Sequence, residues 1–136
     1  MEKKCVMVID SELPLGLIAN TSAVLALTLG NKIEEIIGPA VMDGDGHTHE
    51  GITTIPIPIL KGSGPLIKEL WQTISSHYPD LLLVDFSNVA QVTQNYAIYA
   101  ERIASCKSPD LQYLGIAIYG NKKEVNKLTG SLPLLR

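Results

Sequence analysis

Two aspartates that end apolar runs are the strongest candidates for chemistry in this sequence. Asp10 directly follows Cys5–Ile9, and Asp85 lies near the end of Leu81–Phe86. Ligands of open α/β sheets bind outside the carboxyl ends of strands. If these two strands are parallel neighbours, the carboxylates share a cleft in which repulsion raises one pKa and supplies a general acid or base. If instead each carboxylate caps a turn or a helix N-terminus, neither is catalytic; Asp85 is the preferred catalytic residue and Asp10 a candidate ligand-binding residue.

Three polar residues immediately after Asp85 extend this candidate site. Ser87, Asn88 and Gln91 offer hydrogen-bond donors and acceptors on a segment that leaves a buried strand. Binding residues commonly lie on such segments. We therefore expect these three side chains to contact a ligand.

The first predicted helix, Gly16–Leu29, adds a second set of candidates. Its apolar residues occur nearly all round, which predicts a buried helix. Asn20 and Thr21 are consecutive polar residues, and with Gly16 they are candidate ligand-binding positions. In the alternative interpretation, their side chains bond locally to the backbone or to a partner helix.

Two lysines begin the last predicted helix. Lys122 and Lys123 follow Gly120 and lie in the first turn, where positive charge opposes the helix dipole. This placement suggests an anion such as phosphate near the turn, against the alternative of solvated lysines. No Gly-x-Gly-x-x-Gly, Walker or Gly-x-Ser-x-Gly motif occurs, so nucleotide-binding and serine hydrolase functions are excluded.

The segment Asp43–Glu50 superficially resembles a metal-binding loop. His47 and His49 are two residues apart, which places both rings on one side of an extended chain. An EF-hand loop beginning at Asp43 would need glutamate where Thr54 stands. We therefore predict an exposed hairpin loop, and we predict no metal and no cofactor.

The composition predicts a single α/β domain spanning residues 1–136. Hydrophobic residues make up 46% of the chain and charged residues 18%, which is usual for a soluble α/β protein. The net charge of −3, without a long basic run, argues against tRNA or other nucleic acid as a partner. Leu13–Leu29 is interrupted by polar residues and is too short for a membrane span. We expect no membrane anchor.

Cysteine usage and the N-terminal segment favour the cytoplasm. Cys5 and Cys106 are far apart, with no zinc-type or disulfide-type spacing. The first residues run directly into a strand pattern, which leaves no room for the apolar core of a cleavable signal. We expect a cytoplasmic protein.

Strands alternate with helices along the chain. We predict strands at Cys5–Ile9, Leu81–Phe86 and Leu114–Tyr119, and an edge strand at residues 53–59, where prolines interrupt pairing. Four helical segments are predicted between and after these strands. The first helix is capped by Gly30, and the second begins at Pro65 with Ser63 or Gly64 as cap. A helical segment follows Ser87, and the last helix runs from Asn121 to Gly130. This order predicts a mixed sheet of about four strands flanked by helices.

The succession of elements resembles a known family. The strand is followed by Leu-Pro-Leu-Gly-Leu-Ile-Ala, a strand closing on Asp85, Leu-Gly-Ile-Ala-Ile-Tyr-Gly, and a helix ending Leu-Thr-Gly-Ser-Leu-Pro-Leu-Leu. Over nearly the whole chain this resembles the type 2 peptidyl-tRNA hydrolases, and more closely an uncharacterised bacterial family of that fold. The resemblance implies the type 2 peptidyl-tRNA hydrolase fold, with Asp85 matching the family's active-site aspartate.

The family's first helix begins with Lys-Gly-Lys-x-x-Ala-Gln-x-x-His, and only part of this pattern is present. Gly16 is retained, whereas Leu15 and Leu17 stand at the positions of the lysines, Thr21 replaces the glutamine and Val24 the histidine. Loss of both cations removes charge that would stabilise a developing anion. The sequence therefore favours a protein that binds a small ligand near Asp85 over a peptidyl-tRNA hydrolase.

Two alternatives stay open. In the first, the protein is an enzyme that hydrolyses an ester or amide with Asp85 as base or orienting group. In the second, it is a structural or interaction module whose apolar first helix forms a homodimer face. A homodimer is the expected oligomeric state.

Overall fold

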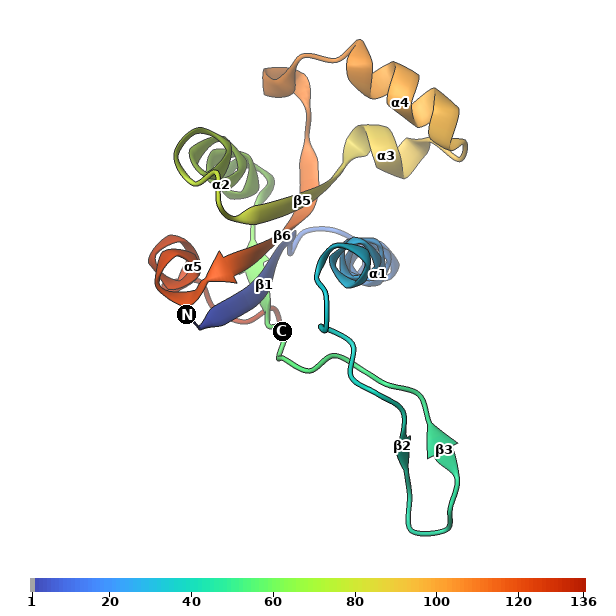
Figure 1. The fold of residues 1–136 in the computed structure, drawn as a ribbon. Helices are drawn as coiled ribbons and strands as arrows, with labels where there is room; N and C mark the ends of the chain where they lie inside the picture. The colour runs from blue at the N-terminus through green and yellow to red at the C-terminus, as the bar shows by residue number, and fades with distance from the viewer. Residues whose placement is uncertain (1) are drawn as a thin grey trace.

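A four-stranded mixed β-sheet forms the centre of the computed structural model, which describes residues 2–136 (Figure 1). The strand order is β4 (Ile59–Gly62), β1 (Lys3–Asp10), β6 (Tyr113–Asn121) and β5 (Leu82–Ser87). β4 runs parallel to β1, and β6 is antiparallel to both β1 and β5. The predicted mixed sheet of about four strands is confirmed.

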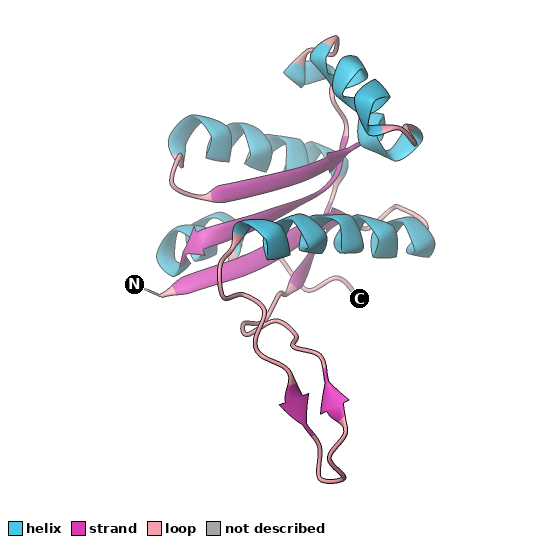
Figure 2. Ribbon diagram, turned by 45° about the vertical axis from the view of Figure 1, so that its right-hand side comes forward, coloured by secondary structure: helices cyan, strands magenta, loops and turns pink. Residues whose placement is uncertain are grey.

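Helices cover both faces of the sheet. α1 (Leu15–Lys32) lies on one face, and α2 (Gly64–His77) and α5 (Lys122–Thr129) lie on the other (Figures 1 and 2). β1 is apolar without alternation because both of its faces are covered. Cys5, Met7 and Ile9 pack with the residues of α1, whereas Val6 and Val8 pack on the opposite side.

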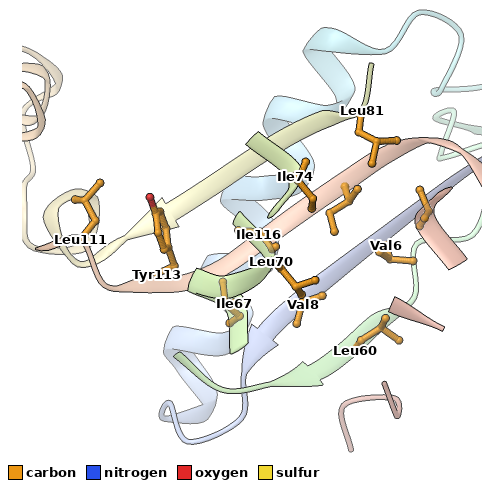
Figure 3. Packing of buried hydrophobic residues seen from close by; sticks show 12 residues of the cluster. Val6, Val8, Leu60, Ile67, Leu70, Ile74, Leu81, Leu111, Tyr113 and Ile116 are labelled. Carbon is orange, nitrogen blue, oxygen red and sulfur yellow. The ribbon is translucent and has the colours of Figure 1, made fainter. Parts of the chain in front are cut away.

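The core on the α2 side is built mainly from branched aliphatic residues. Figure 3 shows Ile67, Leu70 and Ile74 of α2 above Val8 and Ile116 of the sheet. The three helix residues recur at three- and four-residue spacing, which places them on one face of the helix. Burial of this stripe holds α2 against the sheet.

Two segments project from the helix-covered sheet. α3 (Asn88–Val92) and α4 (Tyr96–Ala104) follow β5, and a 3₁₀ turn (Ser108–Asp110) returns the chain to β6. Between α1 and β4 the chain forms a hairpin of β2 (Val41–Met42) and β3 (Thr48–His49), which extends away from the sheet (Figure 1). The exposed hairpin and the helical segment after Ser87 both agree with the sequence predictions.

Two of the predicted helix caps are present. The Ser63 hydroxyl accepts a hydrogen bond from the Leu66 N–H at 3.3 Å, and the Asn121 carboxamide oxygen accepts from the N–H groups of Lys123 and Glu124. Gly130 occupies the C-cap position of α5, with right-handed backbone angles. These residues mark the start of α2 and both ends of α5.

Two predicted boundaries are wrong. α1 does not end at Gly30 but continues to Lys32, because Gly30 keeps a helical conformation and the extended backbone begins at Ile33. Residues 53–59 do not form an edge strand; the strand at that edge of the sheet is β4, which starts where the prolines end. Proline lacks the N–H that a ladder needs, so Pro58 contributes only its carbonyl, which accepts from the Met7 N–H at 2.9 Å, and the paired residues of β4 begin at Ile59.

None of the helices within residues 2–136 combines the length and the apolar character needed to cross a membrane.

Candidate functional site

Asp85 lies on an edge strand, beneath the start of the α3–α4 segment. It is paired across β5 and β6 with Ile116, and its side chain faces α2. The indole Nε1 of Trp71 in α2 donates a hydrogen bond to Asp85 Oδ2 at 3.1 Å. Asp85 is half-buried, and burial raises the pKa of its carboxyl above the ordinary value, while the bond from Trp71 acts in the opposite direction.

Aromatic side chains surround the Asp85 carboxyl. Trp71 stacks on Tyr113 with ring centroids 5.4 Å apart and planes 18° apart. Burial, followed by the charge of Asp85, raises the pKa of Tyr113 to about 12. The same two causes raise the pKa of Tyr99 in α4. Asp85 therefore lies in an apolar environment between α2, β6 and α4, in which its charge affects the pKa values of neighbouring tyrosines.

Two buried hydroxyls near Asp85 have no hydrogen-bond partner among the described residues. They are the hydroxyls of Ser87 and Tyr113, two residues that are paired across β5 and β6. Buried polar groups are normally hydrogen-bonded, and an unpaired one costs roughly 1–3 kcal/mol. Unpaired hydroxyls next to a buried carboxyl are typical of sites that bind a ligand or an ordered water.

A cavity of about 360 Å³ opens beside Asp85. One wall comes from α1 through Val24 and Thr28, and the other from β5 and the α3–α4 segment, including Phe86 and Tyr99. Small-molecule sites are typically about 300–1,000 Å³ and mostly apolar, with a few polar groups. The cavity has this character, with Asp85 as its acidic group.

Asp10 does not share this cleft. β6 lies between β1 and β5 in the sheet. Val8 of β1, Ile116 of β6 and Asp85 of β5 are aligned across the three strands, and Asp10 lies further along β1. Asp10 lines a different cavity, of about 420 Å³, and its carboxylate accepts a hydrogen bond from the Glu12 N–H at 3.0 Å. The hypothesis of two repelling carboxylates is therefore wrong, and burial rather than repulsion raises the pKa of Asp85.

The candidate positions of α1 do not converge on Asp85. The Thr21 hydroxyl is buried and donates to the Leu17 carbonyl at 2.7 Å, as the local-bonding interpretation predicts. Gly16 and Asn20 are exposed on the outer surface of the helix. The α1 residues that line the cavity are Val24 and Thr28, whose apolar or small side chains gave no chemical signal in the sequence.

The polar residues after Asp85 have different roles. Ser87 precedes α3 but makes no capping hydrogen bond, because its side chain is buried. Asn88 exchanges hydrogen bonds with Gln112 and so attaches α3 to the segment before β6. Gln91 is exposed on α3 and does not line the cavity. Only Ser87 lies beside Asp85 in the buried interior.

The two lysines and the histidine loop lie elsewhere. β6 starts near the site and ends at Asn121, so Lys122 and Lys123 lie at the far end of the strand, where Lys122 is 3.3 Å from Glu2. In the hairpin, the Asp43 carboxylate is 2.8 Å from the His49 ring, which is the first cause lowering the pKa of Asp43. Within residues 2–136, no three or more His, Cys, Asp or Glu side chains are grouped to hold a metal ion.

Sequence reasoning missed Trp71, Tyr99 and Tyr113 as site residues. Trp71 and Tyr99 stand in segments that were predicted to be helical, and Tyr113 stands before a predicted strand. The available signal was chemical: buried Trp N–H and Tyr O–H groups need polar partners. The chain has one tryptophan, Trp71, which packs against the core from α2. Its N–H group therefore indicated a hydrogen-bond acceptor nearby.

Comparison with known proteins gives a family and a fold. A structure of a protein of unknown function from Agrobacterium tumefaciens matches with a TM-score of 0.88 and 19% sequence identity, covering 98% of each chain. Comparison with curated proteins gave no match. The profile of a family described as "Protein of unknown function (DUF2000)" matches residues 3–136. The chain, with its Asp85 cavity, belongs to the DUF2000 family of proteins of unknown function.

Proposed function

We propose that this protein binds a small organic molecule carrying an amine or amide group, and that the N–H groups of this ligand donate to Asp85. The observation that carries the proposal is the half-buried Asp85 in the lining of the cavity between α1 and α4. Perturbed carboxyls in clefts are frequent at functional sites. The unpaired hydroxyls of Ser87 and Tyr113 lie on β5 and β6 near Asp85, outside the lining of this cavity.

The chemistry of the surroundings supports a ligand with donors. A carboxylate removed from water is unfavourable unless hydrogen bonds or an opposite charge compensate it. Trp71 supplies one such bond. A ligand ammonium or amide would supply others, while the rings of Tyr96, Tyr99 and Phe86 in the cavity lining would contact its apolar part or its cation.

A binding screen tests this proposal. Small amines, amides and guanidines are screened by thermal shift, and hits are titrated calorimetrically against wild type, Asp85→Ala and Asp80→Ala. Asp80 is an exposed carboxylate outside the cavity and is the matched control. We expect Asp85→Ala to weaken binding at least about tenfold, because a hydrogen bond to a charged group contributes about 1.5–3 kcal/mol. Equal affinity for wild type and Asp85→Ala, or a screen without hits, contradicts the proposal.

Hydrolysis of an ester or amide, such as that of peptidyl-tRNA, is the second candidate function. A carboxyl whose pKa is raised by burial is suited to general acid or base catalysis. We further propose that the chain shares the type 2 peptidyl-tRNA hydrolase fold that its sequence resembles. Two features argue against this activity. The net charge is −3, which does not favour binding of tRNA, and the exposed Leu15 stands where that family carries a lysine.

Peptide release from peptidyl-tRNA separates the two functions. We expect purified protein to release no peptide above the uncatalysed rate, because the cationic partners of the reaction are leucines. Release that Asp85→Asn abolishes, with folding intact by circular dichroism, would establish the hydrolase instead.

We propose a cytoplasmic, bacterial-like setting for this activity. Cys5 and Cys106 are both free thiols. Burial raises the pKa of Cys5 to about 11, which keeps this thiol protonated and unreactive. Such cysteine usage is typical of reducing compartments.

A further inference from the structure

The outward face of α1 is uncharged and rich in apolar and small residues. No Asp, Glu, Lys or Arg occurs from Leu15 to Asn31, although this helix lies on the surface of the sheet. Leu27 is 79% exposed and Leu15 82%. A surface helix normally places charged or polar residues opposite its buried stripe, so this face has the composition of a covered surface.

Two projecting segments continue the apolar surface on either side of α1. In the hairpin segment, Ile37, Val41, Met42 and Ile52 are exposed, with Met42 at 72%. In α3 and α4, the exposed apolar residues are Val92, Tyr96 and Ile98. Figures 1 and 2 show both segments extending beyond α1, away from α2 and α5.

We propose that a second copy of this chain packs on α1 and is held between the two projecting segments, forming a two-fold symmetric homodimer. Ala23 and Gly30 are exposed on α1 with Leu27, and small residues allow two helices to approach closely. Such a face is self-complementary, as an isologous interface requires. This inference is independent of the identity of any ligand.

The hairpin is the part of the chain that gains most from a partner. A two-stranded hairpin is at best marginally stable in water when it packs on nothing. Both strands of this hairpin are exposed along their length, and the hairpin carries large apolar side chains. Packing against a second copy would bury these side chains and stabilise the hairpin.

Charge complementarity indicates where the hairpin binds. Residues 33–52 contain five acidic residues and no lysine or arginine, whereas residues 88–107 contain two basic residues, Arg102 and Lys107, and one acidic residue. A two-fold axis along α1 would place the hairpin of each copy against α3–α4 of the other, because these segments lie on opposite sides of α1 (Figure 1). Acidic and basic segments then face each other.

The three segments contain enough exposed residues for an interface of standard size. A standard interface buries about 800 Å² per partner and involves roughly 20–30 residues a side. The hairpin, the outer face of α1 and the α3–α4 segment together contain more than 20 exposed residues. Because Val24 and Thr28 belong to both α1 and the cavity lining, the second copy would also border the Asp85 cavity.

Sedimentation velocity and light scattering on the full chain test the dimer. We expect a mass of about twice the 14.7 kDa of one chain. Leu27→Arg places a charge in the centre of the face and should weaken dimerisation at least about 30-fold, the effect of losing a hot-spot residue. Leu134→Arg is the matched control, because Leu134 is also exposed but lies outside the three segments.

Leu134→Arg should remain dimeric, and both variants should keep the wild-type circular dichroism spectrum. A monomeric wild type at all measured concentrations, or a Leu27→Arg variant as dimeric as wild type, overturns the proposal. The ligand screen does not decide between these results, because it depends on Asp85 and not on the mass of the particle.

Ionic strength and charge reversal test the position of the hairpin. If acidic hairpins face α3–α4, salt should weaken the wild-type dimer. Two double variants reverse the charge of one segment each: Asp45→Lys/Glu50→Lys in the hairpin and Arg102→Glu/Lys107→Glu in α4 and the segment after it. Each variant alone should dimerise less well than wild type. A mixture of the two should form heterodimers, because opposite charges then face each other again. A dimer that salt strengthens would show that the hairpins face one another, and would overturn this part of the proposal.

Discussion

Gly115→Ala is expected to destabilise the protein by about 1–3 kcal/mol, because β6 and α1 are in direct contact at this position. A Cβ atom on Gly115 would lie 2.8 Å from Cγ2 of Thr21 and 3.2 Å from Cγ1 of Ile9. The backbone oxygen of Val8, at 3.3 Å, limits movement in a third direction. Urea denaturation at neutral pH measures the change in the free energy of unfolding.

Thr21 provides a compensating change for this test. Thr21→Ser removes the Cγ2 atom that the new Cβ meets but keeps the hydroxyl that donates to Leu17. Thr21→Ser/Gly115→Ala should therefore be more stable than the sum of the single changes predicts. Gly44→Ala, with no heavy atom within 4 Å of its new Cβ, is the matched glycine control and should be nearly neutral. Equal effects at Gly44 and Gly115 would contradict the close contact.

Asp85→Asn is expected to stabilise the protein at neutral pH by about 0.5–2 kcal/mol, the usual gain when an unfavourable functional group is replaced. Burial raises the pKa of Asp85, so the folded protein holds this proton more tightly than the unfolded chain does. As pH rises from the unfolded value near 4 through the folded value, the unfolded chain loses its proton first, and stability falls. Asparagine cannot ionise, so the variant escapes this loss.

The predicted gain has a defined pH dependence. It should be largest above the folded pKa of Asp85 and should disappear below the unfolded value, where both forms of the wild type are protonated. The amide oxygen of asparagine can still accept from Trp71. In Asp85→Ala this acceptor is absent and the indole N–H is left unpaired, so its gain should be smaller. A difference between Asp85→Asn and wild type that is constant from pH 3 to pH 8, as roughly the accessible range, would mean that burial does not govern this carboxyl.

Local signals in the sequence determined most of the sheet and its caps. The unbroken run around Val6 and Val8 predicted a strand covered on both faces, and that strand is β1. Ser63 and Asn121 predicted helix starts because their side chains can pair with otherwise unpaired N–H groups nearby in sequence. These signals succeed because the interactions that they describe are made within a few residues.

The composition of the candidate site depended on packing between distant segments. Asp85 followed from its place at the end of an apolar run, but Trp71 and Tyr113 reach it only because α2 crosses β5 and β6. Asp10 was the second candidate of the same kind, but β6 lies between β1 and β5. Strand order is a long-range property that neither run encodes by itself.

The sequence by itself therefore determined most of the strands and helices, though not the position of β4, and that α1 is apolar nearly all round. Only the tertiary structure decided which side of α1 is buried, that its other side is left exposed beside the Asp85 cavity, and that the hairpin and α3–α4 extend past it. The physical reason is that periodicity records the character of each residue relative to its neighbours in the chain. The burial of a side chain depends on which distant surface it meets, and for the outer face of α1 that surface is not part of the same chain's core.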